Sequence, residues 1–210
     1  MKIGIIGAGM VGRAFAAAAI KQGHEVMIAN SRQPDTLYSL TKSLGAKAGL
    51  AKEAAEFADV VLLAIPFKYY EQIPAEWLVG KVLIDANNYY PERDGQIALL
   101  DNKESTTSEM IASHFSGARV VKAFNAILAE EILGGGKLAG SEKHRAHPIA
   151  GDDQQAKKIV EHLLEQFGFE VIDVGNLSEG YRFERGSPAY CIPMDGAMLR
   201  QTLEEVQSNN

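Results

Sequence analysis

Near its start the chain reads KIGIIGAGMVG (residues 2–12), an apolar run followed by three glycines in the spacing G-x-G-x-x-G. We predict a strand over Lys2 to Ile6, a tight turn, and a helix from Met10 to about Gln22. In this context Gly7 permits the turn, Gly9 lets the backbone approach a pyrophosphate, and Gly12 lets the helix pack close to the strand. The amides of Gly9, Met10 and Val11 would then hold the phosphates. The stretch therefore predicts a dinucleotide site.

The next apolar run ends in residues that discriminate between the two nicotinamide cofactors. Glu25 to Ala29 is predicted as the second strand, and Asn30, Ser31 and Arg32 follow it. Enzymes that use NAD usually place an Asp or Glu here to bind the ribose hydroxyls. No carboxylate stands at this point, and Arg32 can form a charge-assisted hydrogen bond with a 2′-phosphate, aided by Ser31. We therefore expect NADP rather than NAD.

Further along the chain, short apolar runs alternate with helical patterns. This alternation predicts an α/β protein with a Rossmann-type, doubly wound, mainly parallel sheet covered on both faces. Further strands are expected at Ala46–Ala48, Asp59–Ile65, Lys81–Asp85 and Arg119–Phe124. One helix is expected over Thr36–Ser43. Another should start at Thr106, which has capping-box spacing to Glu109, and continue to about His114.

A Gly-rich polar segment, Gly134 to Arg145, is predicted to be a surface loop between two units. We expect an NADP-binding Rossmann domain over residues 1–145 and a smaller C-terminal α/β lobe over residues 146–210, with one continuous domain as the alternative. The lobe would contain strands at Pro148–Ala150 and Phe169–Val174, a helix capped by Asp152 or Asp153, and a last helix over Pro188 to Val206. The apolar stripe of that last helix predicts packing on the domain or on a second subunit.

Residues that follow the later strands should complete the crevice, because ligands sit beyond the carboxyl ends of parallel strands. We expect Ile65 and Pro66 to turn the backbone beside the nicotinamide, with Phe67 packed near it. Asparagines could bind the ribose or carboxamide, with loop capping as the competing role for each. The residues concerned are Ala86-Asn87-Asn88 and Asn125-Ala126-Ile127, of which Asn88, Asn125 and Ala126 are predicted cofactor contacts.

Composition restricts the classes of protein to which the chain can belong. It has 210 residues, a formal net charge of −6 and a pI of about 5.4, so an acidic surface argues against nucleic acid and anionic membranes as partners. No apolar run approaches the roughly 20 residues that span a bilayer. One cysteine, Cys191, leaves no internal disulfide, and no Cys/His spacing predicts a metal site. We expect a cytoplasmic protein.

Several reactive side chains are interpreted as structural. His144 and His147 are predicted to be solvated loop residues, and Cys191, with no histidine nearby, is not predicted to be a nucleophile. Two aromatic pairs, Tyr69-Tyr70 and Tyr89-Tyr90, could cover a planar substrate or pack the rim. No acid–base pair is recognisable, so the catalytic residues stay unassigned; this fits hydride transfer to a flavin-like ring, where the cofactors carry the chemistry.

Taken together, the motifs resemble the F420-dependent NADP oxidoreductase family and the related cytosolic NADPH domain of STEAP-type metalloreductases. The matching stretches, which span about residues 1 to 180, are Gly7–Gly12, Ser31-Arg32, Ala64-Ile65-Pro66, Ile84–Asn88, Val120–Asn125, Gly151-Asp152-Asp153, Phe167-Gly168-Phe169 and Asp173-Val174-Gly175. The resemblance implies a homodimer that binds NADPH and stacks an acceptor against the nicotinamide near Asn125 to Ala129. The F420 enzymes carry a histidine where this chain has Asn125.

The resulting hypothesis is an NADPH-dependent oxidoreductase that moves a hydride between NADP(H) and a deazaflavin (F420-like), a flavin or another small acceptor. One alternative is a relative of pyrroline-5-carboxylate reductase, whose long helical C-terminal domain has no counterpart in the pattern after Phe169. The other alternative is a module that senses NADP(H) without turnover.

Overall fold

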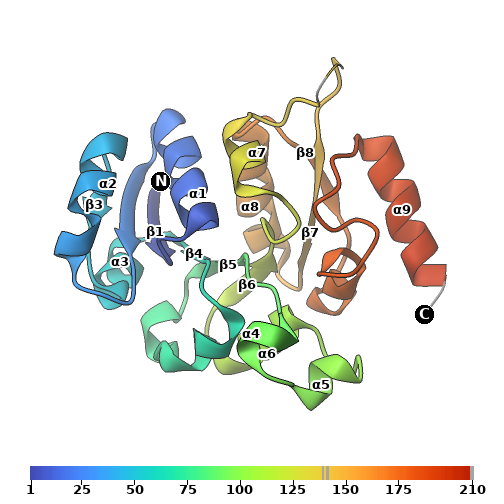
Figure 1. The fold of residues 1–210 in the computed structure, drawn as a ribbon, viewed down its shortest axis with the longest axis horizontal. Coiled ribbons are helices and arrows are strands. Elements are labelled where there is room, and N and C mark those ends of the chain that lie inside the picture. The colour runs from blue at the N-terminus through green and yellow to red at the C-terminus, as the bar shows by residue number, and fades with distance from the viewer. Residues whose placement is uncertain (139, 141, 209–210) are drawn as a thin grey trace.

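The structure is a computed structural model that describes residues 1–138, 140 and 142–208. The described residues form an eight-stranded sheet in the order β3-β2-β1-β4-β5-β6-β7-β8 (Figure 1). All neighbouring strands pair in parallel except β6 and β7, which are antiparallel. The strands are β1 (Lys2–Ile6), β2 (Glu25–Ala29), β3 (Lys47–Ala48), β4 (Val60–Leu63), β5 (Val82–Asp85), β6 (Arg119–Lys122), β7 (Ala146–Gly151) and β8 (Glu170–Asp173). The predicted α/β class and doubly wound sheet are confirmed.

Helices cover both faces of the sheet, so the central strand β4 is buried on both sides. Val60 and Leu62 pack into the core beneath α1 and α8, whereas Val61 and Leu63 pack into the core beneath α3 and α6. Alternate residues of a strand point to opposite faces, so a strand buried on both sides must be apolar throughout. The helices are α1 (Met10–Lys21), α2 (Tyr38–Leu44), α3 (Ala51–Phe57), α4 (Pro91–Asp94), α5 (Ala98–Asp101), α6 (Thr107–His114), α7 (Ala129–Leu133), α8 (Gln154–Gln166) and α9 (Gly196–Ser208), with 3₁₀ turns η1 (Pro34–Leu37), η2 (Phe67–Gln72), η3 (Ala75–Leu78) and η4 (Leu177–Phe183).

Predictions that rested on local capping chemistry are confirmed. Thr106 accepts a hydrogen bond from the Glu109 amide and the Glu109 carboxylate accepts one from the Thr106 amide, which is the expected capping box of α6. Asp153 caps α8 by accepting from the Ala156 amide. Its neighbour Asp152 accepts from the Leu177 amide, so both carboxylates are structural.

The expected start of the last helix is wrong. Residues 188–195 are irregular, and α9 begins only at Gly196. Pro193 lacks an N–H and disfavours helical geometry in the residue before it, and Cys191 has a left-handed backbone with φ of 57°. The helix over Thr36 to Ser43 likewise begins as the 3₁₀ turn η1. The short helices α3, α4, α5 and α7 and the 3₁₀ turns η2, η3 and η4 have no counterpart in the sequence prediction.

The apolar stripe of α9 packs on the same chain. Leu199 and Leu203 are buried together with Ile172 of β8 and Phe183 of η4. Of the two predicted alternatives, packing on the domain and packing on a second subunit, this is the first. The homodimer therefore stays a prediction.

The junction between the two expected units lies within the sheet. Val121 and Lys122 of β6 pair with Gly151 and Ala150 of β7, so the strand ladder continues across the expected boundary at residues 145 and 146. The polar segment before β7 contains a bridge between Lys137 and His144; residues 139 and 141 lie outside the described residues.

Within the described ranges, no helix is long and apolar enough to cross a membrane.

Candidate functional site

The glycine-rich turn between β1 and α1 leaves open space at one position only. Gly7 has φ of +121°, and a Cβ there would lie 2.2 Å from the Ala64 carbonyl oxygen. A Cβ at Gly12 would lie 1.9 Å from the carbonyl oxygen of Gly7. At Gly9, by contrast, a Cβ would meet no atom within 4 Å. Gly7 and Gly12 are thus required by the fold itself, whereas the absence of a side chain at Gly9 keeps a surface free.

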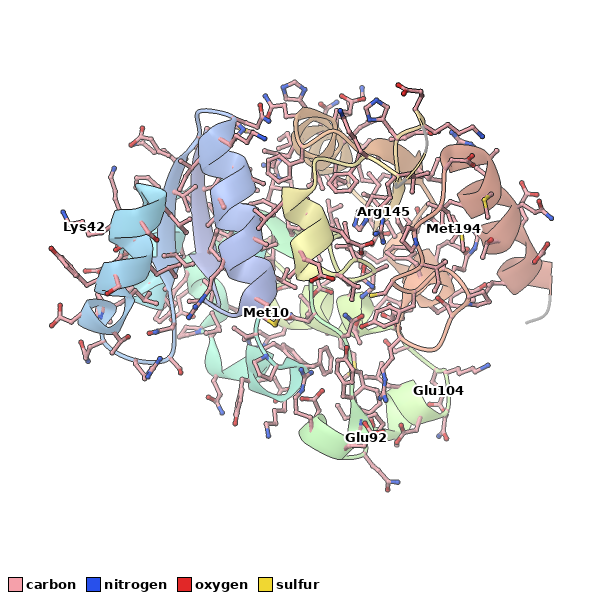
Figure 2. All side chains as sticks on the ribbon, turned by 45° about the horizontal axis from the view of Figure 1, so that its top comes forward. Met10, Lys42, Glu92, Glu104, Arg145 and Met194 are labelled. Atoms are coloured by element: carbon pink, nitrogen blue, oxygen red, sulfur yellow. The ribbon has the colours of Figure 1, made fainter. Side chains whose placement is uncertain are left out.

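That free surface lies at the N-terminus of α1. Gly9 is the N-cap residue, no side chain caps the helix, and no acidic residue stands in its first turn. The first amides of a helix have no intrahelical partner, and together with the helix dipole they attract anions. Met10 is 78% exposed at this end of the helix, beside α7 (Figure 2). A pyrophosphate fits this arrangement.

Arg13, one turn into α1, also belongs to this edge. Its Nε donates to the Ala8 carbonyl at 2.7 Å, which holds the guanidinium against the glycine turn. The sequence prediction did not include Arg13. Its position three residues after Met10, on the first turn of a predicted phosphate-binding helix, was the available signal.

The turn after β2 is shaped by Asn30. Its Oδ1 accepts from the Arg32 amide at 2.8 Å and its Nδ2 donates to Thr36 Oγ1 at 2.9 Å, so this side chain organises the loop. Ser31 and Arg32 are exposed. Within the described residues, the Arg32 guanidinium makes no ion pair or hydrogen bond. An uncommitted cation therefore stands where a 2′-phosphate is expected.

The turns after β4 and β5 are tied together by Asn87. Its Oδ1 accepts from the Ile65 amide at 2.9 Å, while its own amide donates to Asp85 Oδ1 at 2.9 Å. Asn87 is buried, in line with the capping role considered for it. Phe67 is fully buried against Tyr70, with ring centroids 4.9 Å apart, so it supports the Pro66 turn from within the core and offers no face to a nicotinamide.

Asn88 and Asn125 lie against each other at the ends of β5 and β6. Asn88 Nδ2 donates to the Asn125 carbonyl at 2.9 Å, and Asn125 Nδ2 donates to the Phe183 carbonyl at 3.0 Å and to Asn88 Oδ1 at 3.3 Å. Asn125 Oδ1 is buried and has no partner among the described residues. Ala126 is buried, and its carbonyl accepts from Arg145 at 3.3 Å, so any contact that it makes with a cofactor comes from the backbone.

The prediction that His147 is a solvated loop residue is wrong. His147 lies on β7, is fully buried, and accepts a hydrogen bond from the Phe124 amide at Nε2 over 2.7 Å. Burial, and secondarily the charge of Arg145, lower the pKa of His147 to about 3. His144 is exposed, as expected, and interacts with the Gly168 carbonyl. In the described part of the chain no group of three or more His, Cys, Asp or Glu residues could hold a metal.

A buried charged cluster, which we call the Lys122 cluster, was missed by the sequence analysis. It consists of Lys122, Asp85, Glu184, Thr107 and Ser108. Lys122 Nζ lies 3.0 Å from Glu184 Oε1 and 3.7 Å from Asp85 Oδ2, and donates to Thr107 Oγ1 at 2.6 Å. Ser108 donates to Asp85 Oδ2. The cluster ties β5, β6, the start of α6 and the residue after η4 together.

The pKa values of the two carboxyl groups of the Lys122 cluster shift in opposite directions. Burial raises the pKa of Asp85, against the opposing effects of Lys122 and Ser108. Burial also disfavours the charged form of Glu184, but Lys122 and the hydrogen bonds from Thr107 leave its pKa lowered. Glu184 is therefore the ionised partner of Lys122.

The aromatic pairs divide between the core and the rim. Tyr70 is buried, whereas Tyr69 is exposed. Tyr90 lies between the guanidinium groups of Arg93 and Arg185, each 4.6 Å from its ring centroid, and its hydroxyl is 2.7 Å from that of Tyr190.

Burial raises the pKa of the Cys191 thiol, which agrees with its interpretation as a non-nucleophile.

Comparison with known proteins gives one family and several similar structures. Residues 2–89 match the family described as NADP oxidoreductase, coenzyme F420-dependent. A hypothetical protein from Sinorhizobium meliloti superimposes with a TM-score of 0.80 and 29% identity, covering 93% of this chain and 95% of its own. A candidate F420-dependent NADP-reductase from Arthrobacter sp. FB24 has a TM-score of 0.75 and 26% identity, covering 100% of this chain and 94% of its own.

Longer dehydrogenases share the fold. The 3-hydroxyisobutyrate dehydrogenase of Mycobacterium tuberculosis has a TM-score of 0.61 and 18% identity over 84% of this chain and 55% of its own. No curated protein matches the chain by sequence.

Proposed function

We propose that the chain transfers a hydride between NADP(H) and a small acceptor, because residues 2–89 match the F420-dependent NADP oxidoreductase family and two similar structures cover nearly the whole chain. The observation that carries the proposal is the open surface at Gly9, next to the uncapped first turn of α1. The strand order 3-2-1-4 places this turn where the sheet topology reverses, which is where dinucleotides bind in doubly wound proteins.

The choice of NADP over NAD rests on the turn after β2. Asn30 offers no negative charge, and its side chain is already engaged with the loop. Arg32 is exposed and uncommitted, so a 2′-phosphate would gain a cationic partner without breaking an existing ion pair. Gly7, Gly9, Met10, Val11 and Gly12 would hold the pyrophosphate, and Arg13 would stand beside it.

The nicotinamide would lie toward Ile65, Pro66, Asn88 and the Asn125-Ala126 backbone, at the ends of β4, β5 and β6. Bound there, the cofactor supplies the hydride. The Asn88–Asn125 pair fixes the backbone on which the ring and the acceptor would rest, and the unpartnered Oδ1 of Asn125 can accept a hydrogen bond from a carboxamide. A deazaflavin, a flavin or another planar acceptor suits such a site, because the protein then supplies position rather than acid–base chemistry.

An acceptor screen tests this proposal. NADPH absorbance is followed with F420, FMN, riboflavin and small carbonyl compounds, and NADH is run in parallel. We expect oxidation of NADPH by a deazaflavin or flavin, with NADH much slower. Tight NADPH binding without turnover of any acceptor would replace the proposal with the sensing module.

The position of the acceptor can be tested with two exposed leucines of the α7 region. Leu128 precedes α7, next to Asn125-Ala126, and Leu133 ends the helix; they are 47% and 55% exposed. Leu128→Arg should raise the KM for the acceptor and leave the Kd of NADPH nearly unchanged. Leu133→Arg is the matched control and should change neither. Equal effects of the two substitutions would contradict this placement.

A further inference from the structure

The backbone ladder between β4 and β5 ends just before the two turns proposed to face the nicotinamide. Leu63 pairs with Asp85 in the last register position, and the Ala86 amide donates to the Leu63 carbonyl at 3.1 Å. Beyond that point, a single hydrogen bond among the described residues joins the turns 64–66 and 86–88, from the Ile65 amide to Asn87 Oδ1 at 2.9 Å. A side-chain oxygen thus connects the two turns where the backbone ladder stops.

The position of Asn87 is restricted by the Lys122 cluster. Asn87 is 2% exposed, and its own amide donates to Asp85 Oδ1 at 2.9 Å. The second oxygen of Asp85 accepts from Ser108 and lies 3.7 Å from Lys122 Nζ. Asp85, Ser108 and Lys122 are fully buried. Asn87 is therefore attached through its backbone to a buried polar cluster, which restricts where its side-chain oxygen can lie.

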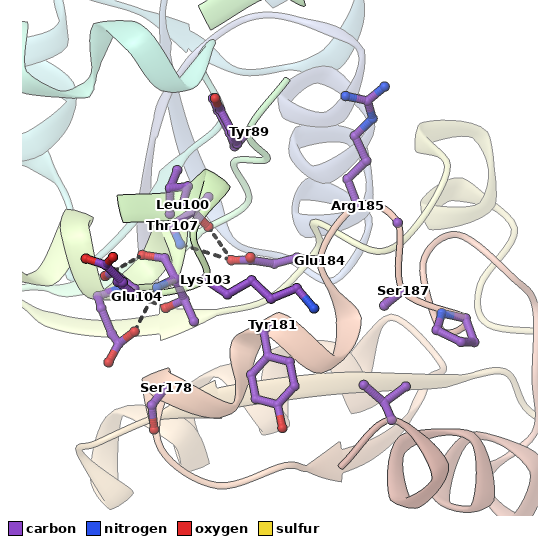
Figure 3. A pocket seen from close by; sticks show the side chains of 16 residues that line it. Tyr89, Leu100, Lys103, Glu104, Thr107, Ser178, Tyr181, Glu184, Arg185 and Ser187 are labelled. Atoms are coloured by element: carbon purple, nitrogen blue, oxygen red, sulfur yellow. Dashed lines mark hydrogen bonds between the residues drawn. The ribbon is translucent and has the colours of Figure 1, made fainter. Parts of the chain in front are cut away.

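The other end of the Lys122 cluster is anchored as well. Glu184 Oε1 lies 3.0 Å from Lys122 Nζ and accepts hydrogen bonds from the amide and the hydroxyl of Thr107 (Figure 3). Glu184 and Thr107 also line a cavity of about 780 Å³, and none of the residues proposed to contact NADP(H) lines this cavity. A chain of polar contacts therefore runs from the cavity wall through the interior to the turn at Ile65.

Ile65 lies beside the glycine turn between β1 and α1. A Cβ built at Gly7 would lie 3.1 Å from Ile65 Cγ2 and 2.2 Å from the Ala64 carbonyl oxygen. The Gly7 amide donates to the Ala29 carbonyl at 2.9 Å, so the glycine turn is itself tied to the end of β2. The placement of Ile65 therefore sets the distance between the proposed pyrophosphate site and the surface against which the nicotinamide would lie.

We infer that Asn87 is a positioning residue for the nicotinamide, which acts through the Ile65 amide and not by contact with the cofactor. The inference rests on the proposed function, because it requires NADP(H) in this crevice. A turn that is held in advance need not be ordered when the ring binds. Hydride transfer also depends on the ring position to within about 1 Å. A nucleotide without a nicotinamide gains nothing from this turn.

Calorimetry with NADPH and with 2′-phospho-ADP-ribose, which lacks only the nicotinamide, tests the inference without turnover. Asn87→Ala removes the oxygen that holds the Ile65 amide. We expect the variant to bind NADPH about three- to tenfold more weakly, as for the loss of one ordinary hydrogen bond. Its affinity for 2′-phospho-ADP-ribose should change less than about twofold. Asn87→Asp keeps an oxygen that can accept from the Ile65 amide and should recover most of the loss.

Asp152→Ala is the matched control. Asp152 also accepts a hydrogen bond from the amide of a distant turn, that of Leu177 at 3.0 Å. It follows β7, which runs antiparallel to β6, so it lies at the opposite edge of the sheet from the proposed crevice. Asp152→Ala should lose stability, as Asn87→Ala does, and should keep the parent ratio of the two dissociation constants.

Equal losses of both nucleotides in Asn87→Ala, or no loss of either, overturn the inference and leave the proposed function intact. A parent protein that binds the two nucleotides equally also overturns it, because the nicotinamide then has no subsite. A parent that binds neither overturns the proposed function and the inference with it. If Asn87→Ala does not fold, hydrogen exchange at the Ile65 amide of the free parent decides. We expect protection there, and exchange as fast as that of an exposed amide overturns the inference.

Discussion

His147 Nε2 accepts a hydrogen bond from the backbone amide of Phe124 over 2.7 Å, and it does so at a residue whose φ is +63°. A left-handed backbone at a bulky residue is strained and persists only where the surroundings hold it. The Phe124 ring packs against Phe15 and Phe167, and the imidazole fixes the amide. This pair directs the chain after β6 into the turn that carries Asn125.

Because the imidazole of His147 is buried and neutral, the free energy of unfolding should decrease as the pH falls. The pKa of His147 falls from 6.5 to about 3 on folding, so between these pH values the unfolded chain binds a proton that the folded chain does not. The contribution of His147 to the free energy of unfolding is therefore fully present above pH 6.5 and is lost as the pH falls toward 3. The loss amounts to at most about 1.4 kcal/mol per pH unit. Urea denaturation of the parent between pH 7 and about pH 4 measures the slope.

His147→Gln should flatten that slope and lower the free energy of unfolding at pH 7, because the packing and the bond to the Phe124 amide are disturbed. The exposed His144→Gln is the control and should keep the slope of the parent. Identical slopes in the parent and in His147→Gln would show that the imidazole is not the group that titrates.

Two glycines of the same turn should respond in opposite ways to alanine. Gly12→Ala places a Cβ 1.9 Å from a backbone oxygen, so we expect a loss of about 1–3 kcal/mol in the free energy of unfolding. Gly9→Ala meets no atom within 4 Å and should keep its stability, but its methyl would fill the space reserved for the pyrophosphate and weaken NADPH. Thermal denaturation and calorimetry on both variants make the comparison. Normal NADPH affinity in Gly9→Ala would place the cofactor elsewhere.

The Lys122 cluster should be worth far more to stability than a surface ion pair. Lys122→Met leaves the carboxylate of Glu184 without its buried partner, and breaking one side of such a pair costs about 3–5 kcal/mol. Lys47→Met removes the exposed pair with Glu25 and should have a much smaller effect. Urea denaturation measures both variants. Similar losses in the two would contradict the structural role of the cluster.

The parts of the fold that could be predicted depend on neighbours in the sequence. The β1 turn, the capping box at Thr106 and the cap at Asp153 each involve residues within a few positions of one another. The apolar run of β4 likewise predicts burial on both faces without knowledge of its partners. Residue type and spacing decide such features, so the chain itself is sufficient.

The features that were missed depend on distant residues. Glu184 reaches Lys122 from 62 positions away, and nothing near either residue indicates the other. A lysine inside the apolar run Val120-Val121-Lys122-Ala123-Phe124 was the available signal, because a buried charge needs a partner. His147 was misplaced because its polar neighbours conceal that β7 is an interior strand.

The central claim, NADP binding at the end of β2, is tested most directly by calorimetry of NADPH and NADH on the parent protein and on Arg32→Ala. A charge-assisted contact with the 2′-phosphate is worth about 1.5–3 kcal/mol. We therefore predict that Arg32→Ala weakens NADPH roughly 10- to 150-fold and leaves NADH almost unchanged. Added salt should reduce the preference of the parent for NADPH, because Arg32 is exposed. Equal losses for both nucleotides would make Arg32 a structural residue, and a parent protein that prefers NADH would contradict the account.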